Sequence, residues 1–333
     1  DLGRMAGSVE AFELAREANE HAPELSGGGN SEVVFHQAYH DLMAISMKHG
    51  LHCSTWDHLA AGGKRAKGAH VARAAGFYMA AQIEAGHCCP VTMTHAAVAA
   101  MKAEPDMLAS WLPKILSRVY DPSFKPVSEK RSATIGMGMT EIQGGTDVRA
   151  NLTEAKPASG EDSGRVFEIT GHKYFMSAPM SDAFLVLAQA PGGLTCFLMP
   201  RFRPDGSVNA LRITKLKDKL GNRSNASSEA EFDGAYAQRI GEEGRGIPAI
   251  IEMVTLTRLD CAVSSAGLMR SGLANAIHHC RHRTVFQKRL TDHTLMLSVL
   301  AEMALHVEAA IVFAIRRARA FDRSPRAPRR RSK

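Results

Sequence analysis

The segment from Met137 to Asp147, MGMTEIQGGTD, carries residue types that could bind a phosphate or a planar cofactor. Gly144 and Gly145 allow the backbone to come close to a ligand, and Thr140 and Thr146 offer hydroxyls beside backbone N–H groups. Such a loop can cradle a pyrophosphate or the polar edge of a ring system. It matches neither a Walker loop nor the G-x-G-x-x-G dinucleotide motif. On residue chemistry alone, an ordinary glycine-rich turn is the favoured interpretation.

The periodicity around this loop predicts the elements that would hold it. Residues 1–131 have apolar residues at helical spacing and predict a helical domain, in which Asp106 caps one helix. Residues 132–240 predict an antiparallel β-barrel or sandwich, because short runs of aromatic and β-branched residues alternate with turn signals. These runs are Val166 to Thr170, Phe184 to Ala188, Thr195 to Met199, Leu211 to Thr214 and Ala230 to Phe232.

Residues 241–322 return to a helical pattern. One helix runs from a first turn containing Pro248 to about Arg283, which is roughly 50 Å at 1.5 Å per residue, and a second runs from about Thr294 to Ala320. Two helices of that length cannot bury their own apolar faces, so they predict the start of an incomplete helical bundle. The predicted fold class is therefore α+β and multidomain, in the order helical domain, β domain, helical bundle.

The net charge of +7 is concentrated at the end of the chain. Nine of the 41 Lys and Arg residues, but one of the 34 acidic residues, lie between positions 316 and 333, so the remainder is nearly neutral, with 32 basic and 33 acidic residues. Residues 323–333 predict a disordered basic tail that would attract phosphates without specificity. A truncated or frame-altered end is the favoured interpretation of this tail.

The remaining composition is typical of a soluble globular protein, with 45% hydrophobic and 23% charged residues. No apolar run approaches the roughly 20 residues that cross a bilayer, so no contact with a membrane is expected. The six cysteines form no C-x-x-C pair, which favours free thiols in a reducing cytoplasm.

Several segments in register resemble the acyl-CoA dehydrogenase family. Residues 140–147 resemble its signature T-E-x-x-(A/G)-G-(S/T)-D, and residues 171–177 resemble its second flavin motif, G-x-K-x-(W/F)-(I/x)-(T/S). The resemblance extends from about Phe35 to Asp322 and is greatest for the AidB-like subgroup, which is linked to the response to DNA alkylation. The chain is identified as a member truncated at both ends. Further matching segments are 82–86, 136–141, 217–227 with Phe232, 241–246, Arg258 with Gly267, and 283–286.

The resemblance implies a bound FAD. Backbone groups of Met137, Gly138, Met139 and Thr140 would line the flavin, and the Thr140 hydroxyl would bind its pyrimidine side. Thr146, beside Gly145, would bind the pyrophosphate. Phe175 and Met176 would lie beside the ring, and Ser177 would donate to N5, the atom that accepts a hydride.

Arg283 and Phe286 would reach the FAD of a neighbouring subunit, which implies a homo-oligomer and, by the family, a tetramer. For Phe286 alone, packing in the core is an equally open interpretation. Gln287 stands where the family usually has Gly after this Phe, and Thr294 replaces a common Gln.

The implied reaction is the α,β-dehydrogenation of an acyl-CoA thioester, in which a carboxylate removes the α-proton while the β-hydrogen leaves as a hydride. The family carries this Glu either beyond the second long helix or immediately before Arg258, and that second position is Thr257 here. The chain is therefore expected to contain no catalytic base and to turn over little substrate. Glu252 and Asp260 are interpreted as ordinary helix residues.

A DNA-associated protective flavoprotein is the alternative function. DNA is then a partner of the full-length parent, because the resemblance assigns DNA binding to the C-terminal part. His278 and His282 have the spacing of a metal pair but no Glu between them, so a solvated face and no metal is the favoured interpretation. His87-Cys88-Cys89 is interpreted as packing near Pro90.

Overall fold

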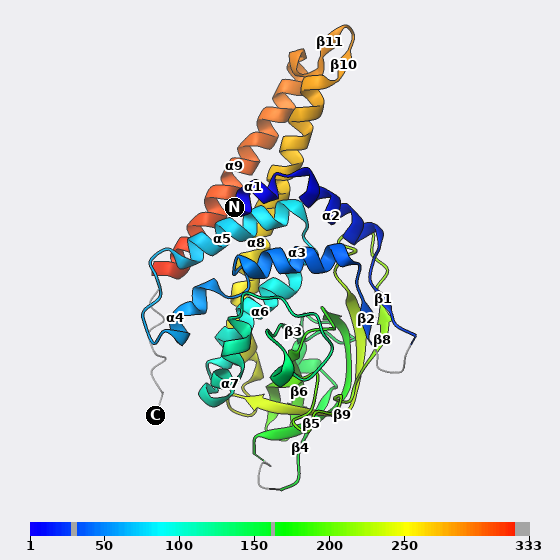
Figure 1. Ribbon diagram of the computed structural model, residues 1–333, viewed down its shortest axis with the longest axis vertical. Coiled ribbons are helices and arrows are strands. Elements are labelled where there is room, and N and C mark those ends of the chain that lie inside the picture. The colour runs from blue at the N-terminus through cyan, green and yellow to red at the C-terminus, as the bar shows by residue number, and fades with distance from the viewer. Residues whose placement is uncertain (28–31, 161–163, 324–333) are drawn as a thin grey trace.

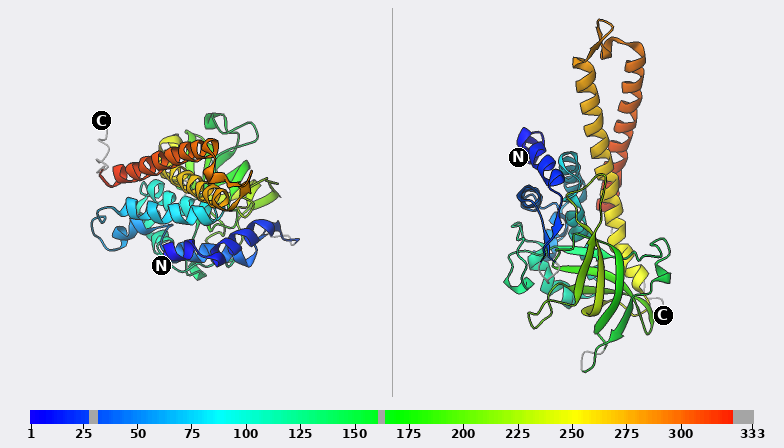
Figure 2. Two further views of the ribbon diagram at one scale, coloured as in Figure 1. Left: turned by 90° about the horizontal axis from the view of Figure 1, so that it is seen from above. Right: turned by 90° about the vertical axis from the view of Figure 1, so that its right-hand side faces the viewer.

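The computed structural model describes residues 1–27, 32–160 and 164–323, so all but the first residue of the predicted tail 323–333 lies outside the described residues. The chain forms a helical layer, a β domain, and a pair of long helices that extends past both (Figure 1). The right-hand view in Figure 2 shows this pair projecting away from the sheet. The predicted fold class is confirmed. The exact domain boundaries remain predictions.

The N-terminal layer is built around α6, whose side chains are almost all buried. Its many alanines let α8 (Gly246–His282) and β3 (Ile135–Gly138) pack closely against it. Pro90 lies in its first turn, where a missing N–H costs no helical hydrogen bond. The layer consists of α1 (Leu2–Ala6), α2 (Val9–Glu20), α3 (Gln37–Lys48), α4 (Asp57–Ala60), α5 (Ala69–Ile83), α6 (Cys88–Met101), α7 (Pro105–Ile115) and the small hairpin β1 (Glu24–Leu25) and β2 (Val33–Val34).

The capping role predicted for Asp106 was wrong. Helix α7 begins at Pro105, with Glu104 as its N-cap residue, and Asp106 lies inside the first turn. Proline is favoured at the first helical position because its fixed φ suits the helix, so the helix starts two residues earlier than a cap at Asp106 would place it.

The strands of the β domain form one sheet in the order β3-β5-β4-β6-β7-β9-β8, and additional pairing of β3 with β6 and of β5 with β9 curves it back on itself. Most neighbours are antiparallel, as predicted, but β3 and β4 each pair with β6 in parallel. Alternating buried residues do not reveal the direction of a neighbouring strand. The strands are β3 (Ile135–Gly138), β4 (Glu154–Pro157), β5 (Val166–Ser177), β6 (Ala183–Ala190), β7 (Gly193–Pro200), β8 (Leu211–Leu216) and β9 (Ser227–Ile240).

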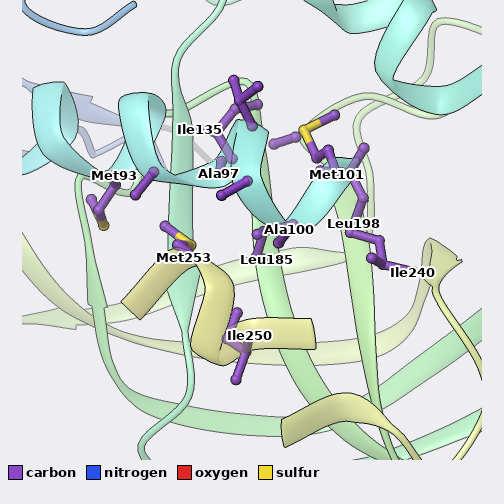
Figure 3. Packing of buried hydrophobic residues seen from close by; sticks show 14 of the residues in the cluster. Met93, Ala97, Ala100, Met101, Ile135, Leu185, Leu198, Ile240, Ile250 and Met253 are labelled. Atoms are coloured by element: carbon purple, nitrogen blue, oxygen red, sulfur yellow. The ribbon is translucent and has the colours of Figure 1, made fainter. Parts of the chain in front are cut away.

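One hydrophobic cluster joins all three parts of the molecule. Figure 3 shows Ala97 and Ala100 of α6 facing Leu185 of the sheet and Ile250 and Met253 of the first long helix. Because this cluster is continuous, the sheet and the helices are held in a fixed relation to each other.

The two long helices, α8 (Gly246–His282) and α9 (Thr294–Arg323), are joined by a tip containing β10 (Thr284–Val285) and β11 (Lys288–Arg289). Both helices lie where the sequence predicts them. Near the end of α9, the Asp322 carboxylate accepts hydrogen bonds from the backbone N–H groups of His70 and Val71, at 2.9 and 3.1 Å. This acid caps the start of α5 and favours its dipole, so it docks α9 onto the helical layer.

Helix α9 is long and apolar enough, by length and composition, to cross a membrane. The expectation that no segment of the chain reaches this threshold was therefore wrong. A helix from the bundle of a soluble protein passes the same test. Apolar side chains of this helix, including Leu295, Leu305 and Val312, are exposed.

A buried ion pair joins the two motifs that the sequence singles out. Lys173 Nζ on β5 lies 2.7 Å from Glu141 Oε1 in the loop after β3, and both side chains are fully buried. Lys173 also donates to the Leu187 carbonyl, and Glu141 accepts from the Thr153 hydroxyl and the Leu152 N–H. Each charge is thus both paired and hydrogen-bonded, as a buried charge requires.

Replacing Lys173 with Met should lower the free energy of unfolding by about 3–5 kcal/mol, because the buried Glu141 carboxylate loses its counter-charge. Urea unfolding followed by circular dichroism measures this change. Arg16→Met is the matched control: it removes the cation of an exposed pair with Glu20, 2.6 Å apart, and should cost less than about 1 kcal/mol. Equal losses of unfolding free energy in the two variants would show that the buried pair stabilises the fold no more than the exposed pair does.

Acid should destabilise the fold through the same carboxylate. Burial raises the pKa of Glu141, but hydrogen bonds from Lys173 and Thr153 outweigh it and lower the pKa to about 2. A carboxylate with a depressed pKa stabilises the folded state above its unfolded pKa, about 4.3, and loses this contribution as the pH falls towards 2. The free energy of unfolding should therefore fall by up to about 3 kcal/mol between about pH 5 and pH 2. Glu141→Gln should lose this share of the pH dependence. If its free energy of unfolding falls with pH in parallel with that of the unmodified protein, the assignment to Glu141 is wrong.

Candidate functional site

Strands β3 and β5 bring the two predicted cofactor motifs side by side. Met137 pairs with Ser177, and Gly138 pairs with Met176, in antiparallel register. Beyond the paired residues, the backbone N–H of Tyr174 donates to the Thr140 carbonyl at 2.9 Å. The loop after β3 and the end of β5 therefore lie side by side at one end of the β domain, here called its edge, although both strands are paired on their other sides.

The loop after β3 turns tightly at two glycines. Gly144 has a φ of +130°, which L side chains rarely adopt, and a Cβ at Gly145 would lie only 2.4 Å from Thr140 Oγ1. Glycine is thus required for Thr140 to pack against this turn. Thr146 follows on the exposed part of the loop. Its contact with a pyrophosphate remains a prediction.

The aromatic rings of Tyr174 and Phe175 lie beside this edge. The Phe175 side chain is 47% exposed, which is unusual for a large ring inside a strand. Lys217 Nζ lies 3.1 Å from the centre of the Tyr174 ring and 4.9 Å from that of Phe175. Met139 is half-buried nearby in sequence. An exposed ring next to backbone groups and hydroxyls can stack on a planar ligand.

Two predicted residues can contribute only backbone atoms. The Met176 side chain is fully buried in the core of the sheet, so it does not reach the edge. A Cβ at Gly138 would lie 3.2 Å from Lys173 Cγ, so the buried lysine stem fills the space where a side chain would be.

Ser177 ends β5 and is half-buried. Its hydroxyl lies 3.5 Å from the Ser227 hydroxyl on β9, and strand pairing holds the two residues opposite each other. Cys89 of α6 also adjoins Ser177: burial raises the pKa of the Cys89 thiol to about 11, and a hydrogen bond with the Ser177 hydroxyl opposes this rise. The Ser177 hydroxyl is therefore located between the sheet and α6.

A cavity of about 730 Å³ opens beside Cys89. Helices α5, α6 and α8 line it, and Asn222 closes one side from the loop before β9. Phe77, Ile83 and Leu268 give it an apolar wall. Its volume and lining suit a small molecule with an apolar chain.

Asp260 lines this cavity, and its carboxylate is fully engaged. Oδ1 accepts from Arg73 Nη1 at 2.7 Å, and Oδ2 accepts from Arg73 Nη2 at 2.8 Å and from the Thr92 hydroxyl at 2.5 Å. The prediction of an ordinary helix residue misses this cavity position and bidentate pair. The available signal was a charged residue between Leu259 and Val263 on the apolar face of α8.

Glu84 is a second carboxylate at the cavity that the sequence did not indicate. It accepts from the Gly86 N–H at 2.7 Å, from His87 Nδ1 at 2.9 Å and from the Ser224 hydroxyl at 2.8 Å. Burial raises the pKa of Glu84, but hydrogen bonds from His87 and Gly86 lower it to about 2. Ser46 Oγ lies 2.8 Å from His87 Nε2, which resembles a nucleophile arrangement, yet Ser46 is only 2% exposed. The network supports the predicted packing role of this segment.

Arg283 and Phe286 lie at the far tip of the helical pair, away from the other predicted site residues (Figure 1). Phe286 is 90% exposed and has a positive φ of 49°. Core packing of Phe286 is thus excluded within this chain. Its contact with the cofactor of a neighbouring subunit remains a prediction.

His282 Nδ1 lies 2.7 Å from the carbonyl oxygen of His278 on the same helix, so the two histidines interact within α8. Within the parts of the chain that the structure describes, no three His, Cys, Asp or Glu side chains gather as a metal-binding group.

Comparisons with known proteins match most of the chain in three parts. Models described as the adaptive response protein AidB N-terminal domain, the acyl-CoA dehydrogenase middle domain and the acyl-CoA dehydrogenase C-terminal domain match residues 1–122, 136–235 and 244–332. The chain is 45% identical to AidB of Escherichia coli (strain K12) over 328 residues, which cover 97% of this chain and 59% of that protein. It therefore spans little more than half the length of this relative.

Solved structures share the fold. Bd2924 in its apo-form is 27% identical with a TM-score of 0.86, covering 96% of this chain and 64% of that one. ACDH-11 of Caenorhabditis elegans in complex with C11-CoA is 24% identical with a TM-score of 0.84, covering 96% and 54%. With its AidB-type N-terminal domain and its acyl-CoA dehydrogenase middle and C-terminal domains in register, this chain belongs to the acyl-CoA dehydrogenase family.

Proposed function

We propose that this chain binds FAD along the edge formed by β3 and β5 and is the flavin-binding part of an acyl-CoA dehydrogenase-type oxidoreductase. The observation that carries the proposal is the pairing of Met137 with Ser177, because it puts both motifs on one edge, where Ser177 also contacts Cys89 of the cavity wall. Members of this family are FAD-binding flavoproteins, which supports the choice of cofactor.

The residues present suit a flavin. The exposed Phe175 ring offers a stacking surface, the half-buried Ser177 hydroxyl offers a donor, and Gly145 lets Thr140 approach the turn closely. When bound, FAD supplies a hydride acceptor at N5. In our proposal the backbone of residues 137–140 holds the pyrimidine side, Ser177 donates to N5, and the Thr146 hydroxyl binds the pyrophosphate.

We propose that the apolar cavity between α5, α6 and α8 takes the acyl chain of an acyl-CoA thioester. Its apolar wall would exclude water from the reacting carbons, and its position beside Cys89 and Ser177 would bring a substrate close to N5. The C11-CoA in the complex of the C. elegans fold relative supports this class of substrate.

Proton abstraction is the step that this chain supports least. Of the described residues that line the cavity, Glu84 and Asp260 carry carboxylates, and each is held by several hydrogen bonds. Thr257 donates its hydroxyl to the carbonyl of its own helix and cannot act as a base. We therefore propose that the chain itself binds the cofactor and substrate but oxidises acyl-CoA slowly.

We further propose that the protein is a homo-oligomer, a tetramer by analogy with the family, in the cytoplasm. The exposed tip carrying Arg283 and Phe286 supports contact with another subunit. The six cysteines are free, which is consistent with a reducing compartment.

A DNA-associated role in the alkylation response is the second candidate, and one observation favours it. Arg316, Arg317, Arg319 and Arg323 are all exposed on the last turns of α9. Such a cluster would attract the phosphate backbone of DNA without reading its sequence.

Occupancy by FAD tests the first proposal. Titration of the chain with FAD, followed by flavin fluorescence, should give saturable binding, and Gly145→Ala should weaken it at least about tenfold (~1.4 kcal/mol), because the new Cβ displaces Thr140. Gly272→Ala is the matched control, since its Cβ meets open space. A branched acyl-CoA added without oxygen should bleach the bound flavin only slowly. Failure to bind FAD would remove the proposed function, and rapid bleaching would show that a base has been overlooked.

Binding to duplex DNA tests the second candidate. If the arginines of α9 bind phosphates, the logarithm of the association constant should fall with the logarithm of salt concentration, and the triple change of Arg316, Arg317 and Arg319 to Gln should reduce that slope by about 2–3. Arg4, Arg16 and Arg149 changed together to Gln remove the same charge from other exposed positions and serve as the control. An equal effect of both sets would rule out a specific role for the end of α9.

A further inference from the structure

Lys219 is held under the Ser177 site by two hydrogen bonds. It is half-buried in the loop between β8 and β9. Its Nζ donates to the Asn225 carbonyl at 2.6 Å and to the Ser227 hydroxyl at 3.1 Å. Because an ammonium group can only donate, the Ser227 oxygen must be the acceptor in the second bond.

This bond leaves the hydrogen of the Ser227 hydroxyl available for a second hydrogen bond. The hydroxyls of Ser227 and Ser177 lie 3.5 Å apart, and by themselves either could be the donor. Since Ser227 Oγ already accepts from Lys219, its own hydrogen is available to donate to Ser177 Oγ. When Ser227 is the donor, Ser177 accepts, and the Ser177 hydrogen, which bonds the Cys89 thiol in this structure, can be donated to flavin N5 when FAD is bound.

The charge of Lys219 would also act on the flavin electrostatically. Burial lowers the pKa of Lys219, and the nearby Cys89 and Glu84 oppose that change. Glu84 is engaged by His87 and Gly86, whereas Lys219 points its donors at the β9 side of the site. A positive charge two hydroxyls from N5 would favour the electron-rich, reduced flavin.

We infer that Lys219 is a positioning residue for the flavin: through Ser227 it orients the Ser177 hydroxyl as a donor to N5 and raises the reduction potential of the cofactor. This inference rests on the proposed function, because it requires FAD with N5 at Ser177. It goes beyond that function by assigning roles to Lys219 and Ser227. A purely structural role of Lys219, in holding the turn through Asn225, is the competing explanation.

The experiment measures two properties of the FAD-loaded chain that do not depend on turnover. One is the two-electron reduction potential, and the other is the dissociation constant of sulfite, which adds to flavin N5. Lys219→Met and Ser227→Ala should each weaken sulfite binding about tenfold and disfavour reduced over oxidised flavin by the same factor, which corresponds to about 30 mV. Lys219→Arg should retain most of both properties. Lys215→Met, which removes an exposed charge from β8, should leave both unchanged.

A double-mutant cycle separates the relay from a general charge effect. Ser227→Ala combined with Ser177→Ala should be no worse than Ser177→Ala alone, because both changes interrupt the same path while the Lys219 charge stays, and an added loss in the double variant would overturn the relay. If Lys219→Met does not fold, Ser227→Ala carries the same test, since it keeps the Lys219–Asn225 bond. Normal potential and sulfite binding in Lys219→Met or Ser227→Ala, with FAD bound, would overturn the inference and leave the proposed function intact. Absence of FAD binding in the unmodified chain would overturn both.

Discussion

The buried pair of Glu141 and Lys173 is the constraint on which the site depends. One charge belongs to the loop after β3 and the other to β5, and neither could remain alone in the interior of the sheet without a large cost. The pair therefore stabilises only the arrangement in which both motifs are in place. Once the pair forms, Thr140 and Ser177 lie on the same edge although they are far apart in the chain. The glycines of the loop permit this arrangement, but the charges enforce it.

Comparable polar contacts hold the helices around the cavity. Arg73 and Asp260 tie α5 to α8, and Glu84 ties the start of α6 to the loop before β9. These bonds give the cavity a fixed shape, and the same bonds occupy its carboxylates. A carboxylate that accepts several hydrogen bonds holds its neighbouring elements in place. It is also a poor base, because protonation would break some of those hydrogen bonds. Rigidity of the cavity and absence of a free base among its described lining residues thus have one cause.

The helical pair differs from this polar, well-satisfied interior. Helix α9 docks at one end through Asp322 yet exposes Leu295, Leu305, Val312 and Phe313 along its length. Exposed apolar rows of this extent are typical of surfaces that another element or subunit covers. The composition that makes α9 resemble a membrane-spanning helix is the same composition that a bundle helix needs on its contact faces.

The order of the three parts, the two long helices, most strands of the β domain and the family could be predicted from the residues alone. Periodicity and motif spacing are local properties of the chain. The motifs also located Thr140 and Ser177 as candidates. The folded chain was needed to show that β3 and β4 lie parallel to β6, that Glu141 pairs with Lys173, and that Asp260 faces a cavity rather than solvent. Each of these depends on which distant segments become neighbours. Burial then determines whether a polar side chain pairs with another residue or lines a cavity.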